Sequence, residues 1–159
     1  MFGWFSSAVK DPQTLGQIGE ELAQLEYKNR GCKIVAANFF NSSGKRAGEI
    51  DLIAADKRHI YFVEVKTRAR EQGTYGTAAE AVNQFKQARL LKAVKLFLLQ
   101  HPDYCQLQPQ IDVCAIIITD FARLRAVQDN PVKYRRDCAL DKISRNVTIV
   151  ANAVEDWTN

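Results

Sequence analysis

The stretch Gly48–Arg68, which reads GEIDLIAADKRHIYFVEVKTR, decides the fold of this chain. Polar and apolar residues alternate over 49–53 and again over 62–66. This period of two is typical of half-buried β-strands. A polar break at 56–59 (DKRH) separates the two runs. The stretch therefore predicts a β-hairpin.

The register of this hairpin brings two acidic residues together. With the turn centred in the middle of the DKRH break, Asp51 lies opposite Glu64, and Ile53 lies opposite Phe62. Directly paired residues have Cβ atoms about 4.5–5.5 Å apart, and two carboxylates at that distance repel unless a proton or a cation lies between them. Lys66 follows Glu64 by two residues, so it lies on the same face.

This set of side chains suits chemistry on phosphates. Asp51 and Glu64 are ligands for a hard cation such as Mg²⁺, and the backbone carbonyl of Val65 could add a third oxygen. Lys66 could orient or deprotonate a water, or neutralise charge on a phosphate. The set therefore indicates metal-assisted phosphodiester hydrolysis. A surface hairpin with a salt-bridged Asp, Glu and Lys is the alternative that the pattern leaves open.

Composition places the chain among globular proteins. It has 159 residues, of which 47% are hydrophobic and 25% charged, and this length predicts one domain. No apolar run approaches the roughly 20 residues of a membrane span, and the N-terminus lacks a signal-peptide pattern. We therefore expect a cytoplasmic protein without membrane contact. The cysteines lack a CxxC pair and do not favour zinc: Cys32, Cys105, Cys114 and Cys138.

Positive charge is concentrated near the C-terminus. The stretch 121–145 holds seven Lys/Arg and three Asp, and so carries the whole net charge of +4. A localised basic region suggests a polyanionic partner. A solvated surface loop explains the charge equally well.

A helix is predicted before the hairpin. Asp11 and Pro12 suit its N-cap and first position, and Gly31 suits its end. Its apolar stripe is Leu15, Ile18, Leu22 and Leu25. A second face would let another element come close and would direct Glu20 toward that element, whereas Glu21 borders the stripe. That face consists of Gly16, Glu20, Ala23 and Tyr27. A solvated helix glutamate is the alternative for both acids.

The remaining elements complete an α/β pattern. Strands are predicted at 33–40, 110–119 and near 147–150, and a long helix from about 78 to 100. On that helix we interpret Lys86 and Arg89 as phosphate contacts, and Lys92 and Lys95 as a solvated face. The order helix, three strands, helix, strand predicts a central mixed sheet flanked by helices.

These motifs resemble the PD-(D/E)xK signature of restriction-endonuclease-like nucleases, although Ile50 stands where that name has proline. They are most similar to the bacterial YraN-like family of predicted endonucleases, which are similar in core to archaeal Holliday-junction resolvases. The resemblance covers roughly 13–119 plus the last strand. It rests on Gly16–Glu20, Gly48–Asp51, Phe62–Arg68, Lys86–Gln87 and Asn152–Ala153. Gln110-Ile111-Asp112 departs from the family's frequent Arg-Phe-Asp.

The resemblance implies a restriction-endonuclease-like αβββαβ core in a single domain over 1–159. Its core would span about 11–119 plus a last strand at about 146–152, with 121–145 as a basic extension. It implies Mg²⁺ or Mn²⁺, held by Asp51, Glu64 and the Val65 carbonyl with Glu20 and Glu49 as further candidates. It also implies Glu20, Asp51, Glu64 and Lys66 as catalytic residues. The residues expected to bind nucleic acid are Arg68, Arg70, Lys86, Gln87 and Arg89.

The expected function is therefore a metal-dependent nuclease that hydrolyses DNA, in branched or otherwise structured form. A non-catalytic module that binds nucleic acid or a protein partner is the alternative, motivated by the basic stretch 121–145. A nuclease acting on RNA is a third hypothesis. Resolvase-like relatives often act as dimers, so a homodimer stays open.

Overall fold

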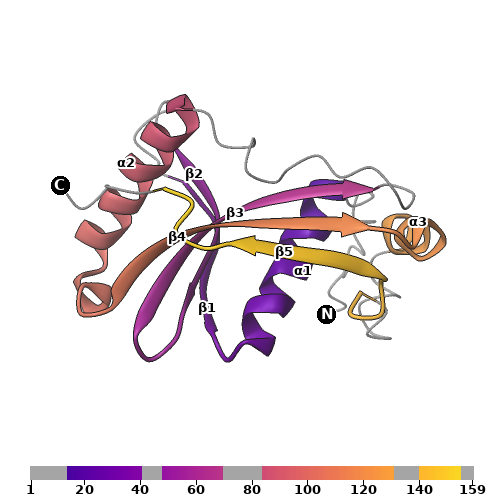
Figure 1. Ribbon diagram of the computed structural model, residues 1–159, viewed down its shortest axis with the longest axis horizontal. Helices are drawn as coiled ribbons and strands as arrows, with labels where there is room; N and C mark the ends of the chain where they lie inside the picture. Colours follow the sequence, from indigo (N-terminus) through magenta and orange to yellow (C-terminus); the bar gives the residue numbers. More distant parts are fainter. Residues whose placement is uncertain (1–13, 41–47, 70–83, 131–139, 155–159) are drawn as a thin grey trace, which may run out of the picture.

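A five-stranded mixed sheet with helices on both faces forms the body of the protein (Figure 1). The computed structural model describes residues 14–40, 48–69, 84–130 and 140–154. The predicted α/β fold is confirmed, and the sheet is compatible with a restriction-endonuclease-like core. The elements are α1 Leu15–Asn29, β1 Lys33–Phe40, β2 Glu49–Ala55, β3 His59–Ala69, α2 Gln84–Gln100, η2 Pro102–Tyr104, β4 Gln108–Ile118, α3 Phe121–Asp129 and β5 Arg145–Val150.

The sheet follows chain order, β1-β2-β3-β4-β5. β2 and β3 pair antiparallel with Leu52 opposite Val63 and Ile53 opposite Phe62, so the predicted hairpin register is confirmed. β3 and β4 pair in parallel along their whole lengths. Such a pair needs a long crossover, and α2 lies within it. β1 and β5 form the two edges, both antiparallel to their neighbours.

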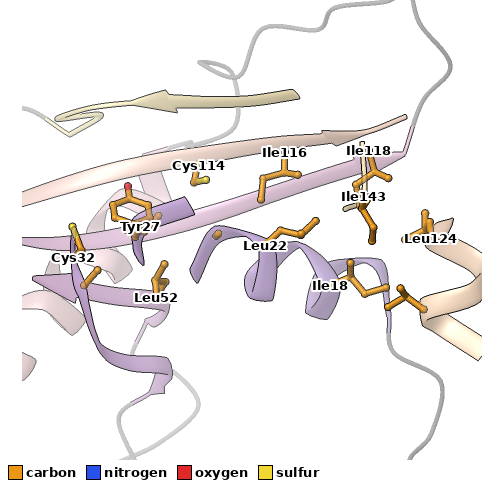
Figure 2. Packing of buried hydrophobic residues seen from close by; sticks show 14 residues of the cluster. Ile18, Leu22, Tyr27, Cys32, Leu52, Cys114, Ile116, Ile118, Leu124 and Ile143 are labelled. Carbon is orange, nitrogen blue, oxygen red and sulfur yellow. The ribbon is translucent and has the colours of Figure 1, made fainter. Parts of the chain in front are cut away.

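Alternating residues of the strands build one core on each face of the sheet. Leu52 and Val63 face α1, where they pack with Ile18 and Leu22 (Figure 2). The intervening residues face α2, where Phe97 stacks edge-on against Phe39 and Phe62 at ring-centroid distances of 5.2 and 5.7 Å. Burial of these two apolar layers stabilises the sheet between its helices.

The start of α1 differs from the prediction. Its N-cap is Thr14, whose Oγ1 accepts from Gln17 N–H while the Gln17 side chain accepts from Thr14 N–H. This capping box satisfies two backbone donors at once, which explains why the helix begins there. The prediction of Asp11 as N-cap is wrong, and Asp11-Pro12 itself lies outside the described residues. The predicted end is confirmed, because Gly31 follows the Arg30 C-cap with φ +85°.

The basic stretch 121–145 is partly built into the fold. Its first residues form α3, which the sequence analysis did not predict, and its last residue begins β5. Arg123 donates to the Lys142 carbonyl at 3.1 Å, and Arg145 donates to the carbonyls of Asp141 and Ile143, each at 3.0 Å. These two arginines therefore connect α3, the following turn and β5.

Other boundaries differ by a few residues. β4 begins at Gln108, two residues before the prediction. β5 ends at Val150, as predicted for the strand near 147–150, whereas the end at about 152 that the resemblance implies is too late. Asn152 has φ +50°, which belongs to a turn and explains the earlier end of β5. The predicted start of α2 near residue 78 lies outside the described residues. Among the described helices, none is long and apolar enough to cross a membrane.

Candidate active site

The two predicted acids, Asp51 and Glu64, lie just beyond the last backbone pair of the β2–β3 ladder. The backbone register extends to Leu52 and Val63. Asp51 lies one residue before Leu52 on β2, and its Oδ2 accepts a hydrogen bond from the Val65 N–H at 2.7 Å. The Val65 N–H thus donates to a side-chain carboxylate rather than to a backbone carbonyl of a neighbouring strand. This hydrogen bond holds the Asp51 side chain against β3.

Glu64 and Lys66 form an ion pair on one face of β3, as the period of two predicted. The Lys66 Nζ lies 2.6 Å from the Glu64 Oε1. The side chains keep 29% and 17% of their surface exposed, respectively, so both groups are half-buried and still reach solvent. Lys66 thus offsets one of the two carboxylate charges at this point of the sheet.

Burial raises the pKa of Asp51 to about 7. The Val65 N–H favours the ionised form and opposes this effect, as does the charge of Lys66, whereas the charges of Glu64 and Glu20 raise the pKa further. The Asp51 carboxyl group is therefore only partly ionised near neutral pH. A cation placed between these carboxylates would relieve the same repulsion.

Glu20, on α1, is a further carboxylate whose charge affects this group. It is half-buried on α1, and its charge acts on Asp51. The helix approaches β3 at Gly19, where an added Cβ would lie 1.6 Å from the Thr67 Oγ1. The prediction that Gly16 belongs to the close-packing face is wrong: Gly16 is exposed, since it precedes the point of contact by almost one turn. Ala23 and Tyr27 of that predicted face are buried.

The donor set fits magnesium better than a fully protein-bound metal. Among the residues that the structure describes, no three His, Cys, Asp or Glu side chains gather into a group that could hold a metal ion. Mg²⁺ needs only one or two carboxylates, with waters and substrate phosphate as its other ligands. Asp51 and Glu64 meet that need. Roles for the Val65 carbonyl and for the exposed Glu49 stay predictions.

Exposed arginines lie on two elements near the acids. Arg68 is exposed on β3, two residues after Lys66, and Arg89 is exposed on α2. α2 packs directly onto the start of β2, because a Cβ at Gly48 would lie 2.2 Å from the Arg89 carbonyl oxygen. Gln87 is half-buried on the same helix. Two other predicted contacts cannot be placed: Arg70 and the side chain of Lys86 lie outside the described part of the chain.

A second polar cluster lies at the turn end of the hairpin, and little in the sequence indicates it. Asp112 is only 2% exposed. Its carboxylate accepts from the Tyr27 hydroxyl and from Gln110 Nε2, each at 2.8 Å, and from Asn152 N at 3.3 Å. The side chains of Tyr27, Gln110 and Asp112 line a pocket of about 360 Å³ that also includes Tyr61. The one signal in the sequence was a single charge within an apolar strand.

These contacts give Asp112 a structural role. Burial, and then the Asp112 charge, raise the pKa of Tyr27, so its hydroxyl keeps the proton that it donates. Three donors around one buried carboxylate connect α1, β4 and the turn after β5. A buried carboxylate satisfied in this way stabilises the fold without a ligand.

Fold and site together define a class of protein. It is an α/β protein with an open mixed sheet, compatible with a restriction-endonuclease-like core, that carries an acid pair and a lysine on its central hairpin. Residues 19–116 match Uncharacterised protein family UPF0102. The chain belongs to this family.

Relatives from distant bacteria share most of their length with this chain. A UPF0102 protein of Nocardia farcinica is 42% identical over 111 residues, which cover 70% of this chain and 82% of that protein. One from Carboxydothermus hydrogenoformans is 39% identical over 102 residues, covering 64% and 80%. One from Acinetobacter baumannii (strain AYE) is 36% identical over 127 residues, covering 79% and 89%.

Proposed function

We propose that this protein is a metal-dependent nuclease of the PD-(D/E)xK type that hydrolyses phosphodiester bonds in branched or otherwise structured DNA. One observation carries the proposal. Asp51 accepts the Val65 N–H, Lys66 pairs with Glu64, and the charges of Glu64 and Lys66 both act on Asp51. A half-buried acid with a raised pKa, a second carboxylate and a lysine form the kind of cluster that occurs at functional sites.

Each residue has a role in this proposal. Asp51, Glu64 and the Val65 carbonyl would hold Mg²⁺ or Mn²⁺. When bound, the ion supplies a Lewis acid and lowers the pKa of a coordinated water. Lys66, which already donates to Glu64, is placed to orient the attacking water or to neutralise charge on the phosphate. Glu20 adds a further carboxylate from α1.

Basic residues around the acids favour a nucleic-acid substrate. Arg68 is exposed on β3, two residues after Lys66, and Arg89 is exposed on α2, whose backbone packs against Gly48. Both suit phosphate contacts, which position a nucleic-acid backbone without reading its sequence. Arg70, Lys86 and Gln87 belong to the same proposed surface. Our preference for DNA over RNA comes from the resemblance to junction resolvases.

The test uses labelled junction, flap and duplex DNA, and matching RNA, with Mg²⁺ or Mn²⁺. Cleavage should require the metal and should disappear in Asp51→Ala and Lys66→Ala. Asp103→Ala and Lys95→Ala change an exposed acid and an exposed lysine outside the site, so they are matched controls. Cleavage that survives both site substitutions, or a wild-type protein that cleaves none of these substrates, would overturn the proposal.

A second candidate is a module that binds nucleic acid or a protein partner without cleaving. The charge of 121–145 favours it, since Arg125 and Lys142 are exposed there. Arg123 and Arg145 favour it less, because both bond to backbone carbonyls. Binding that weakens steeply with salt, without metal-dependent cleavage, would support this candidate. A lack of affinity for DNA and RNA would count against its nucleic-acid form.

A further inference from the structure

Among the described glycines of α1, Gly19 lies closest to the sheet, where it contacts Thr67 of β3. A Cβ at Gly19 would lie 1.6 Å from the Thr67 Oγ1, 2.6 Å from its Cβ and 2.8 Å from its Cγ2. The ordinary range for such contacts begins near 3.4 Å. The two residues therefore fit only because position 19 has no side chain.

This contact lies next to two residues of the proposed site. Gly19 precedes Glu20 on α1, and Thr67 follows Lys66 on β3. Ile18 and Leu22 anchor the same turns of α1 in the apolar core, so a change at Gly19 cannot be absorbed by a freely moving helix. Because Glu20 follows Gly19 on the same turn of α1, a shift of this turn away from β3 would move Glu20 as well.

The hydroxyl of Thr67 gives the contact a second unusual feature. Its Oγ1 is buried and has no hydrogen-bond partner in the described structure. Burying an unpaired hydroxyl costs free energy. No hydrogen bond from this hydroxyl therefore maintains the close packing of α1 on β3. The contact depends on the complementary shapes of Gly19 and the Thr67 side chain.

We propose that Gly19 and Thr67 are positioning residues, whose contact places Glu20 at the acid pair. This proposal rests on the proposed nuclease function, since it assigns the contact a role in that site. An added methyl group would have to move from 1.6 Å to about 3.4 Å from the Thr67 side chain, and α1 would carry Glu20 with it. Misplacement of a catalytic group by about 1 Å can lower a rate about 100-fold.

The experiment measures DNA cleavage and Mn²⁺ affinity, the latter by electron paramagnetic resonance. Gly19→Ala should lower cleavage about 100-fold and Mn²⁺ affinity by about 10-fold or more. Adding Thr67→Gly should recover most of both, because it removes every Thr67 atom near the new methyl. Adding Thr67→Ala should not, since the Cβ at position 67 would remain 2.6 Å away. Thr67→Gly alone controls for the flexibility of the new glycine.

A second comparison separates positioning from general damage. In a Glu20→Gln background, Gly19→Ala should cause no further loss, because the group that it displaces has already lost its charge. An equal further loss would overturn the proposal, as would a Gly19→Ala protein with unchanged cleavage and Mn²⁺ affinity. Should Gly19→Ala fail to fold, Thr67→Ala is compared in the wild-type and Glu20→Gln proteins, because it deletes Oγ1 and Cγ2 and loosens the contact with Gly19. Its loss should be confined to the wild-type protein, and an equal loss in both would overturn the proposal.

The two proposals can fail separately. A wild-type protein that neither cleaves nucleic acid nor binds Mn²⁺ would refute the proposed function. The positioning effect is then read from the Val65 amide in ¹H–¹⁵N spectra, since that N–H bonds to Asp51. Gly19→Ala should shift this signal in the same direction as Glu20→Gln, and the variant that also carries Thr67→Gly should restore it. A Val65 amide signal whose chemical shift does not change in Gly19→Ala would refute the positioning role.

Discussion

The substitution Asp51→Asn should stabilise the metal-free protein at alkaline pH. The folded pKa of Asp51 is about 7, whereas an unperturbed aspartate has a pKa of about 3.9. Between these values the folded state holds a proton that the unfolded state has released. The free energy of unfolding therefore falls as the pH rises from about 4 to about 7, and the full penalty persists above 7.

The magnitude follows from the two pKa values. One pKa unit corresponds to about 1.36 kcal/mol, so the penalty at pH 8 is at most about 4 kcal/mol. An asparagine keeps an oxygen that can accept the Val65 N–H, and it removes only the charge. We therefore expect Asp51→Asn to be about 2–4 kcal/mol more stable than wild type at pH 8, with no difference near pH 4.

The assay is urea unfolding from about pH 2 to pH 8.5 in the presence of a chelator. Asp56→Asn is the control with the opposite sign. Partial burial favours a higher pKa for Asp56, but the N–H groups of Arg58 and His59 and the Tyr61 hydroxyl outweigh it and lower the pKa to about 2. Asp56→Asn should lose stability above about pH 4, and the difference should vanish as the pH falls toward 2. A stability gain of Asp51→Asn that is equal at pH 4 and pH 8, or a loss at pH 8, would refute the reasoning.

Four other predictions concern stability, metal binding and nucleic-acid binding. Tyr27→Phe should lower the free energy of unfolding by about 1–3 kcal/mol, because it leaves the buried Asp112 short of a donor; an unchanged urea midpoint would contradict this. Gly48→Ala should cost about 1–3 kcal/mol by overpacking against the backbone of α2, and the melting temperature measures it. Mn²⁺ at 100 times its dissociation constant should stabilise wild type by about 2.7 kcal/mol but not Asp51→Ala, and equal stabilisation of both would exclude Asp51 as a ligand. Arg68→Ala should weaken DNA binding at all sequences and reduce the slope of log K against log salt by about one; an unchanged slope would remove Arg68 from the interface.

The sequence alone determined the elements whose signals are local. The alternation in 49–53 and 62–66 and the polar break between them predicted both strands and their register, because side chains of a strand change face at every residue. Gly31 predicted the end of α1 because a left-handed residue there favours glycine. The placement of Glu64 and Lys66 on one face followed from the same period.

Only the tertiary structure decided how distant parts of the chain meet. Tyr27 and Asp112 are 85 residues apart in sequence and bond across the α1 face of the sheet. Gly19 and Thr67 touch because α1 and β3 pack at one particular height, which no local pattern encodes. The capping box at Thr14 and the helix α3 also escaped prediction, since competing caps and tertiary packing override weak local preferences. The hairpin thus came from the sequence, whereas the surroundings that raise the pKa of Asp51 came from the fold.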